Sequence, residues 1–312
     1  MAIPTGTLTT TSDITALVKT AYDQYVRMAL RSIPVMRALA DVKPVQQAMP
    51  GSSVVFSIYS DLATATGTLN ESTDVSSVAF GNPSQVTVTL NEYGNAVTTT
   101  KKLNLTSFND VDAALADVIA YNAADSIDVV VANVLTGGSN VIYGGTATGA
   151  SGVTASGTMA VADIREAVTQ LRTNKAVPRI GELYAAYLHP RQSADLRAEA
   201  GTGGFQELTK YVERTPFVAG AVGVIEGAFV VETPRVLSAS NGASPAVTLY
   251  KAVVAGKEAL AEAQAADIST VIGPEIDALR RFRTIGWYYF GGFARLREAA
   301  LYRIETAASI TG

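Results

Sequence analysis

Cysteine is absent from this chain of 312 residues, and histidine occurs once, as His189. Without cysteine there are no disulfides, no thiolate metal sites and no thiol nucleophile. A single histidine excludes metal sites built from two imidazoles and leaves no second imidazole for catalysis, so we interpret His189 as a structural or a surface residue. No run of about eighteen apolar residues occurs, and the amino end lacks the basic and apolar segments of a signal peptide. We therefore expect no cofactor, no metal, no membrane span and no secretion by that route.

Sequence patterns of catalytic sites are also missing. Residues 144–151 have the glycine spacing of a phosphate-binding loop, but Ala150 stands where the essential lysine belongs, so we interpret them as a linker. No Gly-x-Ser-x-Gly elbow occurs anywhere, which removes the serine-hydrolase pattern. Two pairs of carboxylates at helical spacing are interpreted as solvated helix faces. These pairs are Asp163 with Glu166, and Glu258 with Glu262. The sequence therefore predicts that the protein is not an enzyme.

Basic residues are missing from one long segment and concentrated in another. Residues 44–100 contain no lysine or arginine and four carboxylates, whereas residues 279–307 contain six arginines and two glutamates, a local net charge of 6 − 2 = +4. The whole chain has 24 basic and 28 acidic residues, a formal net charge of −4, which argues against a dedicated nucleic-acid-binding domain. Either both segments are ordinary solvated faces, or the acidic segment of one subunit lies against the basic segment of another. The candidate intersubunit contacts are Asp61, Glu71, Asp74, Arg280, Arg281, Arg283, Arg295 and Arg297.

Enough apolar material is present for a folded core, since 48% of the residues are hydrophobic and 17% are charged. Residues 54–59 and 86–90 alternate with period two and predict a long two-stranded arm over residues 51–100. Seventeen of those fifty residues are Ser or Thr, so the tip at residues 64–83 is too polar for a core. A lone hairpin is marginally stable in water. We therefore expect the arm to lie on a neighbouring subunit.

Helical periodicity marks two segments in the first half of the chain. After an extended arm at residues 1–11, Ser12 is a candidate N-cap for an amphipathic helix that ends before Pro34. A linker from Lys43-Pro44 to Pro50-Gly51 then delivers the β arm. A second helix of about 28 residues is expected to begin near Ser107 and to end at Gly137-Gly138, which gives a length of about 40 Å at 1.5 Å per residue.

Residues 138–157 are rich in small residues and mark the clearest boundary in the chain. Beyond them the sequence predicts a helix at residues 161–174, a buried strand at 183–188 and a helix that begins with Pro190. A tight hairpin is expected at residues 222–231, turning at Glu226-Gly227. A strand at 247–254, a helix at 257–266 and two strands within 282–306 complete the chain, with a bend or bulge at Gly291-Gly292. Trp287, with the aromatics after it, is interpreted as part of a strand core or of a subunit contact.

This order of elements resembles the major capsid protein of tailed double-stranded-DNA bacteriophages, the Hong Kong 97-type fold. Residues 187–197, which read Tyr-Leu-His-Pro-Arg-Gln-Ser-Ala-Asp-Leu-Arg, are similar to a strand, His-Pro turn and helix found in a branch of that family. Residues 222–233 are similar to its Gly-rich hairpin. The resemblance implies an α+β phage capsid fold with an N-terminal arm, an extended loop, a peripheral domain with a spine helix, and an α/β axial domain.

The resemblance also implies a division of the chain and a set of partners. Residues 1–50 would be the N-terminal arm and first helix, 51–100 the extended β-hairpin loop, 101–139 with 271–312 the peripheral domain, and 140–270 the axial domain. Copies of the chain would assemble as hexamers and pentamers into an icosahedral shell around double-stranded DNA, which is contacted non-specifically. A portal and a separate scaffolding protein are expected partners, and a decoration protein is left open. The shell would be assembled in the host cytoplasm and become part of the virion.

Two departures and two alternatives accompany that resemblance. Some members join a lysine of the extended loop covalently to an asparagine, but no lysine lies between residues 44 and 100, so that bond is not expected. Some carry a long N-terminal scaffolding region, whereas the first expected helix begins here near residue 12. An encapsulin-type bacterial compartment that holds a cargo enzyme has the same fold and is the main alternative. A monomeric carbohydrate-binding or hydrolytic protein would need surface aromatics or paired carboxylates on strands.

Overall fold

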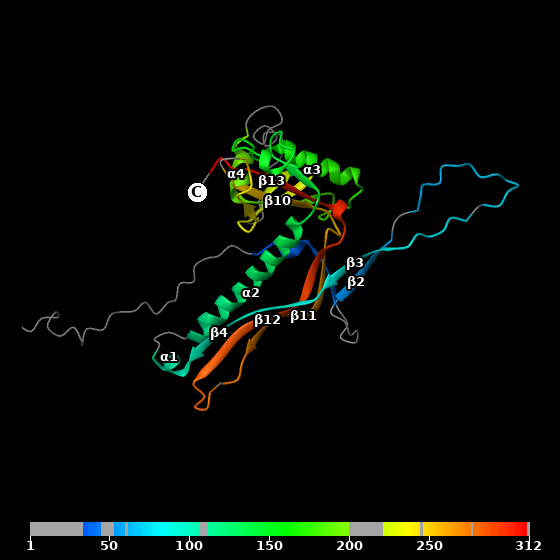
Figure 1. Cartoon of the computed structure of the whole chain (residues 1–312). Helices are drawn as coiled ribbons and strands as arrows, with labels where there is room; N and C mark the ends of the chain where they lie inside the picture. Colours follow the sequence, from blue (N-terminus) through cyan, green and yellow to red (C-terminus); the bar gives the residue numbers. More distant parts are fainter. Residues whose placement is uncertain are drawn as a thin grey trace, which may run out of the picture.

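A computed structural model of the chain describes residues 34–44, 53–59, 62–75, 77–106, 111–199, 221–243, 246–275 and 277–310. The described residues form an α+β fold with two β-sheets, a long helix that runs beside both, and a hairpin that projects to one side (Figure 1). The N-terminal arm and the helix expected at residues 12–33 lie outside the described residues.

The first sheet has four strands and forms the elongated part of the molecule. Its strand order is β1-β11-β12-β4, in which β1 runs parallel to β11 and the other pairs are antiparallel. Ile285, Trp287 and Tyr289 of β12 are buried in the main core, as the alternation of an amphipathic strand requires. The strands are β1 (Ala40–Pro44), β11 (Leu260–Ile272), β12 (Phe282–Arg295) and β4 (Asn91–Thr100).

The long helix α2 (Val111–Thr136) lies along this sheet and packs mainly against β12. Its buried residues recur every four positions and so form a continuous stripe in which each lies next to the one before it: Ile119, Ala123, Ile127, Val131 and Leu135. Residues 115–136 are long and apolar enough on average to cross a membrane. We interpret α2 as a core helix instead, because this face is covered by the sheet and because Asp128 is fully buried and hydrogen-bonded within the chain.

The second sheet has seven strands in the order β5-β13-β10-β6-β8-β7, with the short β9 also paired to β10. Helix α3 packs on it through Ile164, Val168 and Leu171, which are buried in the main core. The strands are β5 (Val141–Tyr143), β6 (Tyr184–Leu188), β7 (Ala221–Ile225), β8 (Ala228–Glu232), β9 (Ser238–Ala239), β10 (Leu249–Ala255) and β13 (Leu301–Thr306). The helices are α3 (Val161–Thr173) and α4 (Pro190–Ala198), with short 3-10 turns η2 (Ala150–Gly152) and η3 (Glu298–Ala300).

Local sequence signals are confirmed in this second unit. Helix α4 has Pro190 at its first position, and His189 caps it by accepting a hydrogen bond from the Arg191 N–H. The hairpin β7–β8 turns at Glu226 and Gly227, whose φ angles of 48° and 85° are those of the tight turn that the sequence predicts. The interpretation of His189 as a structural residue is confirmed, because its ring also stacks on Tyr250.

The helix predicted at residues 257–266 is wrong, because this segment enters β11. Leu260, Ala261, Glu262 and Ala263 are all fully buried, with β1 paired on one side and β12 on the other. Burial on both faces of a central strand overrides the helix propensity of alanine and glutamate. The interpretation of Glu262 as a solvated helix carboxylate is therefore also wrong.

The structure also differs from the predicted division of the chain. Residues 91–100 do not belong to the two-stranded arm; they form β4, which pairs with β12 along its length. Strand β11 begins at residue 260 and joins the four-stranded sheet, whereas the last strand, β13, joins the seven-stranded sheet. Lys43 and Pro44, expected to begin a linker, are the last two residues of β1. Each difference comes from pairing between segments far apart in sequence, which local patterns do not contain.

Candidate assembly surfaces

The projecting hairpin is fastened to the body at its root. Strands β2 (Ser53–Ile58) and β3 (Ser84–Thr89) pair antiparallel, as the sequence predicts. Val88 is fully buried and packs with Phe56 and with Ala261 and Ala263 of β11. At Gly292 of β12 a Cβ atom would lie 2.0 Å from the Thr89 carbonyl oxygen, so only glycine permits this approach. The expected bulge lies opposite Gly291, where the β11–β12 register shifts beyond Gln264.

Beyond its root, the hairpin exposes large apolar side chains. The rings of Tyr59 and Phe80 are in contact, tilted by 31° with their centroids 5.4 Å apart, yet these side chains are 62% and 65% exposed. The other exposed apolar residues beyond the root are Leu62, Leu69, Val75 and Val78. An isolated exposed apolar residue is ordinary, but six on one projecting loop mark an interaction surface. We call residues 62–83 the hairpin tip.

Two of the predicted acidic contacts, Glu71 and Asp74, lie exposed on the hairpin tip, and Asp61 lies outside the described residues. Figure 1 shows that the hairpin projects away from the body, opposite to the end where α1 (Lys101–Thr106) and the β11–β12 turn lie. Among the described residues, the tip therefore makes no contact with the basic residues at that end. A contact between the tip and that end would join two molecules.

The opposite end of the four-stranded sheet combines apolar and basic residues. Helix α1 (Lys101–Thr106) follows β4 directly and is tied to the β11–β12 turn by the hydrogen bond from the Lys101 N–H to the Arg281 carbonyl, 2.8 Å. Between α1 and the turn lies a small open pocket of about 170 Å³. It is lined by Thr99, Lys101, Leu105, Glu275, Arg280, Arg281, Phe282 and Arg283. We call this region, with the exposed Lys102, Leu103, Ile272 and Leu279, the distal end.

The β11–β12 turn at the distal end contains two residues with an unusual backbone conformation. Asp277 and Arg280 have φ angles of 92° and 50°, in the left-handed region that non-glycine residues seldom occupy. Arg281 is fixed by an ion pair of 2.6 Å between its Nε and Asp277 Oδ2. Such conformations persist where the surrounding structure holds them, and they are frequent at functional sites.

The structure separates the predicted basic segment into two groups. Arg280, Arg281 and Arg283 meet at the distal end, whereas Arg295 and Arg297 lie elsewhere. Arg295 donates to the Val134 carbonyl at 2.9 Å and pairs with Glu298 at 3.0 Å, and Arg297 is 3.5 Å from Glu258. The net charge of the segment is therefore not carried by one surface.

Arg295 and Arg303 close the carboxyl end of α2. The last turn of this helix contains no basic residue of its own, so its carbonyls need donors from elsewhere. Arg295 bonds the Val134 carbonyl, and Arg303 bonds the Thr136 and Gly138 carbonyls. Two guanidinium groups from the strands thus stabilise the negative end of the helix dipole.

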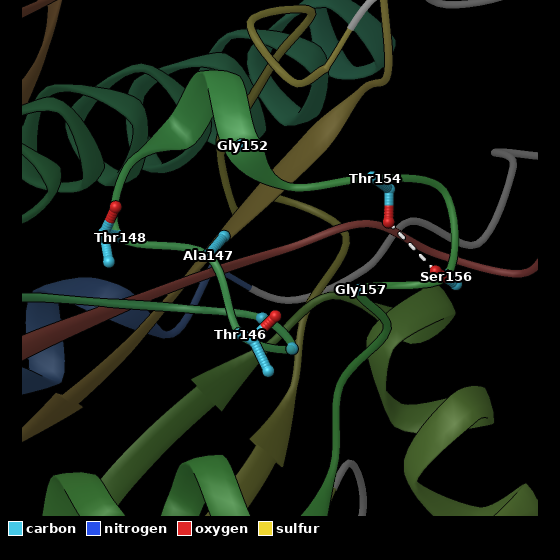
Figure 2. A pocket seen from close by; sticks show the side chains of 9 residues that line it. Thr146, Ala147, Thr148, Gly152, Thr154, Ser156 and Gly157 are labelled. Carbon is cyan, nitrogen blue, oxygen red and sulfur yellow. Dashed lines mark hydrogen bonds between the residues drawn. The ribbon is translucent and has the colours of Figure 1, made fainter.

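The Gly-rich segment that resembles a phosphate loop lines an open pocket of about 480 Å³ (Figure 2). Its side chains are small, with hydroxyls at Thr146, Thr148, Thr154 and Ser156, and Figure 2 shows the Thr154 and Ser156 hydroxyls bonded to each other at 2.9 Å. No charged residue is among the described residues that line it. The pocket therefore lacks a cation with which to bind phosphate.

Within the described part of the chain, no group of three or more His, Asp or Glu residues is arranged to hold a metal. Burial, together with the nearby Arg191, lowers the pKa of His189, which suits its neutral capping role. Trp287, interpreted from sequence as part of a strand core or of a subunit contact, is 5% exposed and donates to Asn122 Oδ1 at 2.9 Å. These residues act in packing.

Reasoning from the charges in the sequence misses the apolar part of both surfaces. The signal was present: leucine, valine and phenylalanine recur in a polar loop too long for a turn, and α1 places Leu103 and Leu105 beside two lysines. The apolar residues of the loop follow no period, so a search for helix or strand patterns passes over them.

Comparisons with known proteins give one consistent result. The sequence matches the family model described as phage capsid protein over residues 8–310. A comparison with curated proteins gives no match. The capsid of Ralstonia phage GP4 has a TM-score of 0.77 at 16% identity, covering 99% of this chain and 100% of that chain. The capsid of cyanophage Pam1 has a TM-score of 0.73 at 15% identity, covering 95% of this chain and 98% of that chain. The capsid of the Helicobacter pylori bacteriophage KHP30 has a TM-score of 0.70 at 14% identity, covering 98% of this chain and 100% of that chain.

Proposed function

The chain belongs to the phage capsid protein family, and from that premise we propose that its copies assemble as hexamers and pentamers of an icosahedral shell around double-stranded DNA. As a major capsid protein it is a structural component of the virion and forms the shell from copies of itself. The family match over residues 8–310 is the observation that carries this proposal. An encapsulin-type compartment is not favoured, because the matching family is that of phage capsids.

The remaining partners belong to the same proposal. A portal and a separate scaffolding protein would act during assembly in the host cytoplasm, and the packaged DNA would be contacted without sequence preference. The formal charge of −4 is compatible with this role, because small counterions can neutralise packaged DNA and a container needs no specific grip on phosphate. A closed shell repeats each contact under symmetry, so modest contacts add up to a stable particle.

The two sheets support a revised domain assignment. The four-stranded sheet with α1 and α2 would be the peripheral domain, and α2 its spine helix. The seven-stranded sheet with α3 and α4 would be the axial domain, which then includes β13 and excludes β11. The hairpin β2–β3 with its tip would be the extended loop, which ends at residue 89 rather than at residue 100.

We further propose that the hairpin tip of one subunit docks on the distal end of a neighbour. The tip carries apolar side chains with Glu71 and Asp74 and no cation, and the distal end carries apolar side chains with Lys101, Arg280 and Arg283. Burying one large apolar side chain is worth about 1.5–3 kcal/mol, whereas an exposed ion pair is worth about 0.2–1 kcal/mol. Apolar contacts would therefore give most of the affinity, and the charges would set the register.

Electron microscopy of the purified protein tests the shell assignment. Closed particles of regular size are expected, and only monomers or dimers across a range of salt and pH would contradict it. For the docking contact, the double variant E71K/D74K should fold normally by circular dichroism and form fewer particles. Adding R280E should partly restore assembly. Glu182→Lys, an exposed reversal in the seven-stranded unit, is the control and should assemble normally.

Normal particles from E71K/D74K would refute the electrostatic register and leave the family assignment intact. A separate pair of variants weighs the apolar part of the contact. Leu69 is 77% exposed. The variant Leu69→Ser should impair assembly more than the variant Glu71→Gln. The opposite order would mean that charge, and not apolar burial, gives the affinity.

A further inference from the structure

Residues 34–44, which we call the strap, run between the two sheets and touch both. The strap contains the short turn η1 (Met36–Leu39) and the strand β1, which pairs in parallel with β11. Met36 and Leu39 are each 1% exposed and belong to the main core. The strap thus adds two large apolar side chains to a core that the two sheets and α2 otherwise build.

A buried carboxylate of α2 holds the first part of the strap. Asp128 is fully buried, and its Oδ1 accepts the backbone N–H groups of Met36 at 2.6 Å and Arg37 at 3.1 Å. Its Oδ2 accepts the Val35 N–H at 3.3 Å and lies 3.9 Å from Arg235 Nε, which reaches in from the seven-stranded unit. The carboxylate therefore satisfies the free donors at the start of η1 from a helix more than ninety residues away.

Two further groups fix the rest of the strap. Arg37 pairs with the buried Glu262 of β11 at 2.6 Å. Arg179, on the connection between α3 and β6, donates to the Ala38 carbonyl at 2.9 Å and to Asp41 Oδ1 at 3.1 Å. The strap is thus bonded to α2 and β11 on one side and to the seven-stranded unit on the other.

We propose that the strap is a conformational lock that sets the orientation of the seven-stranded unit relative to α2, and that Asp128 and Arg179 seat it. Its attachments to α2 and to the seven-stranded unit include polar contacts made by side chains of those elements, whereas β1 is held by its pairing with β11, so η1 with Met36 and Leu39 can seat or leave while the strand pairing within each sheet persists. A chain that occupies both hexamers and pentamers needs more than one such orientation. This last step rests on the proposed function, whereas the lock itself does not.

Hydrogen exchange on the full-length protein tests the lock with two variants that remove one seat each. In Asp128→Asn and Arg179→Gln, exchange of the strap amides should accelerate about tenfold or more, the factor expected when a charge-assisted hydrogen bond is lost. Exchange in β10 and α3 should stay at the wild-type rate. The matched controls are Asp117→Asn, an exposed carboxylate on α2, and Arg165→Gln, whose side chain is 51% exposed in an ion pair with Glu226; both should leave the strap unchanged.

Strap exchange at the wild-type rate in both variants would overturn the proposal, as would equal acceleration throughout the chain, which signifies general destabilisation. If Asp128→Asn does not fold, Arg179→Gln decides alone. If the strap also controls assembly, Arg179→Gln should give particles of more than one size where the wild type gives one size. Faster strap exchange in this variant with unchanged particles would refute the link to assembly. Absence of particles from the wild type would contradict the proposed function, and the exchange rates would still decide the lock.

Discussion

Changing Glu262 to glutamine tests the largest disagreement between sequence pattern and structure. Glu262 is fully buried in β11, where its carboxylate accepts from Arg37 at 2.6 Å and from the Tyr289 hydroxyl at 2.8 Å. The Arg37 ring-face contact with Tyr289, 5.5 Å from the centroid, completes a compact cluster. Glutamine has nearly the same shape, so the variant removes the charge without leaving a cavity.

The expected loss of stability follows from these contacts. Removing one partner of a fully buried ion pair costs about 3–5 kcal/mol, because the other charge stays buried without compensation. Arg37 is 32% exposed and also lies 3.7 Å from Asp267, so part of its charge can be satisfied by water and by that carboxylate. We therefore expect Glu262→Gln to lower the free energy of unfolding by about 2–3 kcal/mol.

Urea unfolding of the unassembled protein measures this change. The slope of the unfolding free energy against urea concentration should be the same in variant and wild type, which checks that their folded and unfolded states are comparable. Glu258→Gln is the matched control: its side chain is 57% exposed and lies 3.5 Å from Arg297, so its loss should stay below about 0.5 kcal/mol. The double variant R37M/E262Q should lose less than the sum of the two single losses, because neither charge is left alone. A loss within about 0.5 kcal/mol of zero for Glu262→Gln would refute the buried-pair reasoning.

Three further changes probe other parts of the subunit. Gly292→Ala should displace the root of the hairpin and cost about 1–3 kcal/mol in urea unfolding, whereas Gly67→Ala, with open space around it, should cost little. Burial raises the pKa of the Asp163 carboxyl to about 6, above its ordinary 3.8. The protonated group therefore contributes to stability in full below pH 3.8, and this contribution is lost as the pH rises through about 6. Asp163→Asn should flatten that part of the curve of stability against pH. Arg303→Met should lower the free energy of unfolding by about 3–5 kcal/mol, because it removes the cap of α2 and leaves the buried carboxylate of Glu305, 2.8 Å from Arg303, without its partner. Arg297→Met should lower it by less than about 1 kcal/mol in the same assay.

Elements whose signals are local could be predicted from the sequence. Helix α2 ends at Thr136, directly before the two glycines that the sequence marked as its stop, and α4 begins at Pro190. The β7–β8 hairpin turns at Glu226 and Gly227 as expected. In each case the residues that decide the conformation lie within a few positions of it, so the printed order of residues contains the answer.

Elements that depend on distant partners could not be predicted in this way. The first half of β11 is rich in alanine and contains a glutamate, residues that favour a helix by propensity, and it becomes a strand because β1 and β12 pair with it. Glu262 is buried because Arg37 lies 225 positions earlier in the sequence and meets it in space. No window of ten residues contains a pattern from which the strand or the ion pair could be predicted.

The same limit explains why the charge map of the sequence was only partly informative about assembly. A count over residues 279–307 treats every arginine as equivalent, yet Arg295 and Arg303 satisfy the carbonyls at the end of α2 and are committed within the subunit. The cations that gather at the distal end are fewer, and Arg281 already pairs with Asp277. Charge in this chain therefore serves first to join the long helix to both sheets. At the distal end a small basic excess is set among exposed leucines, so in the proposed docking contact apolar burial would supply most of the affinity.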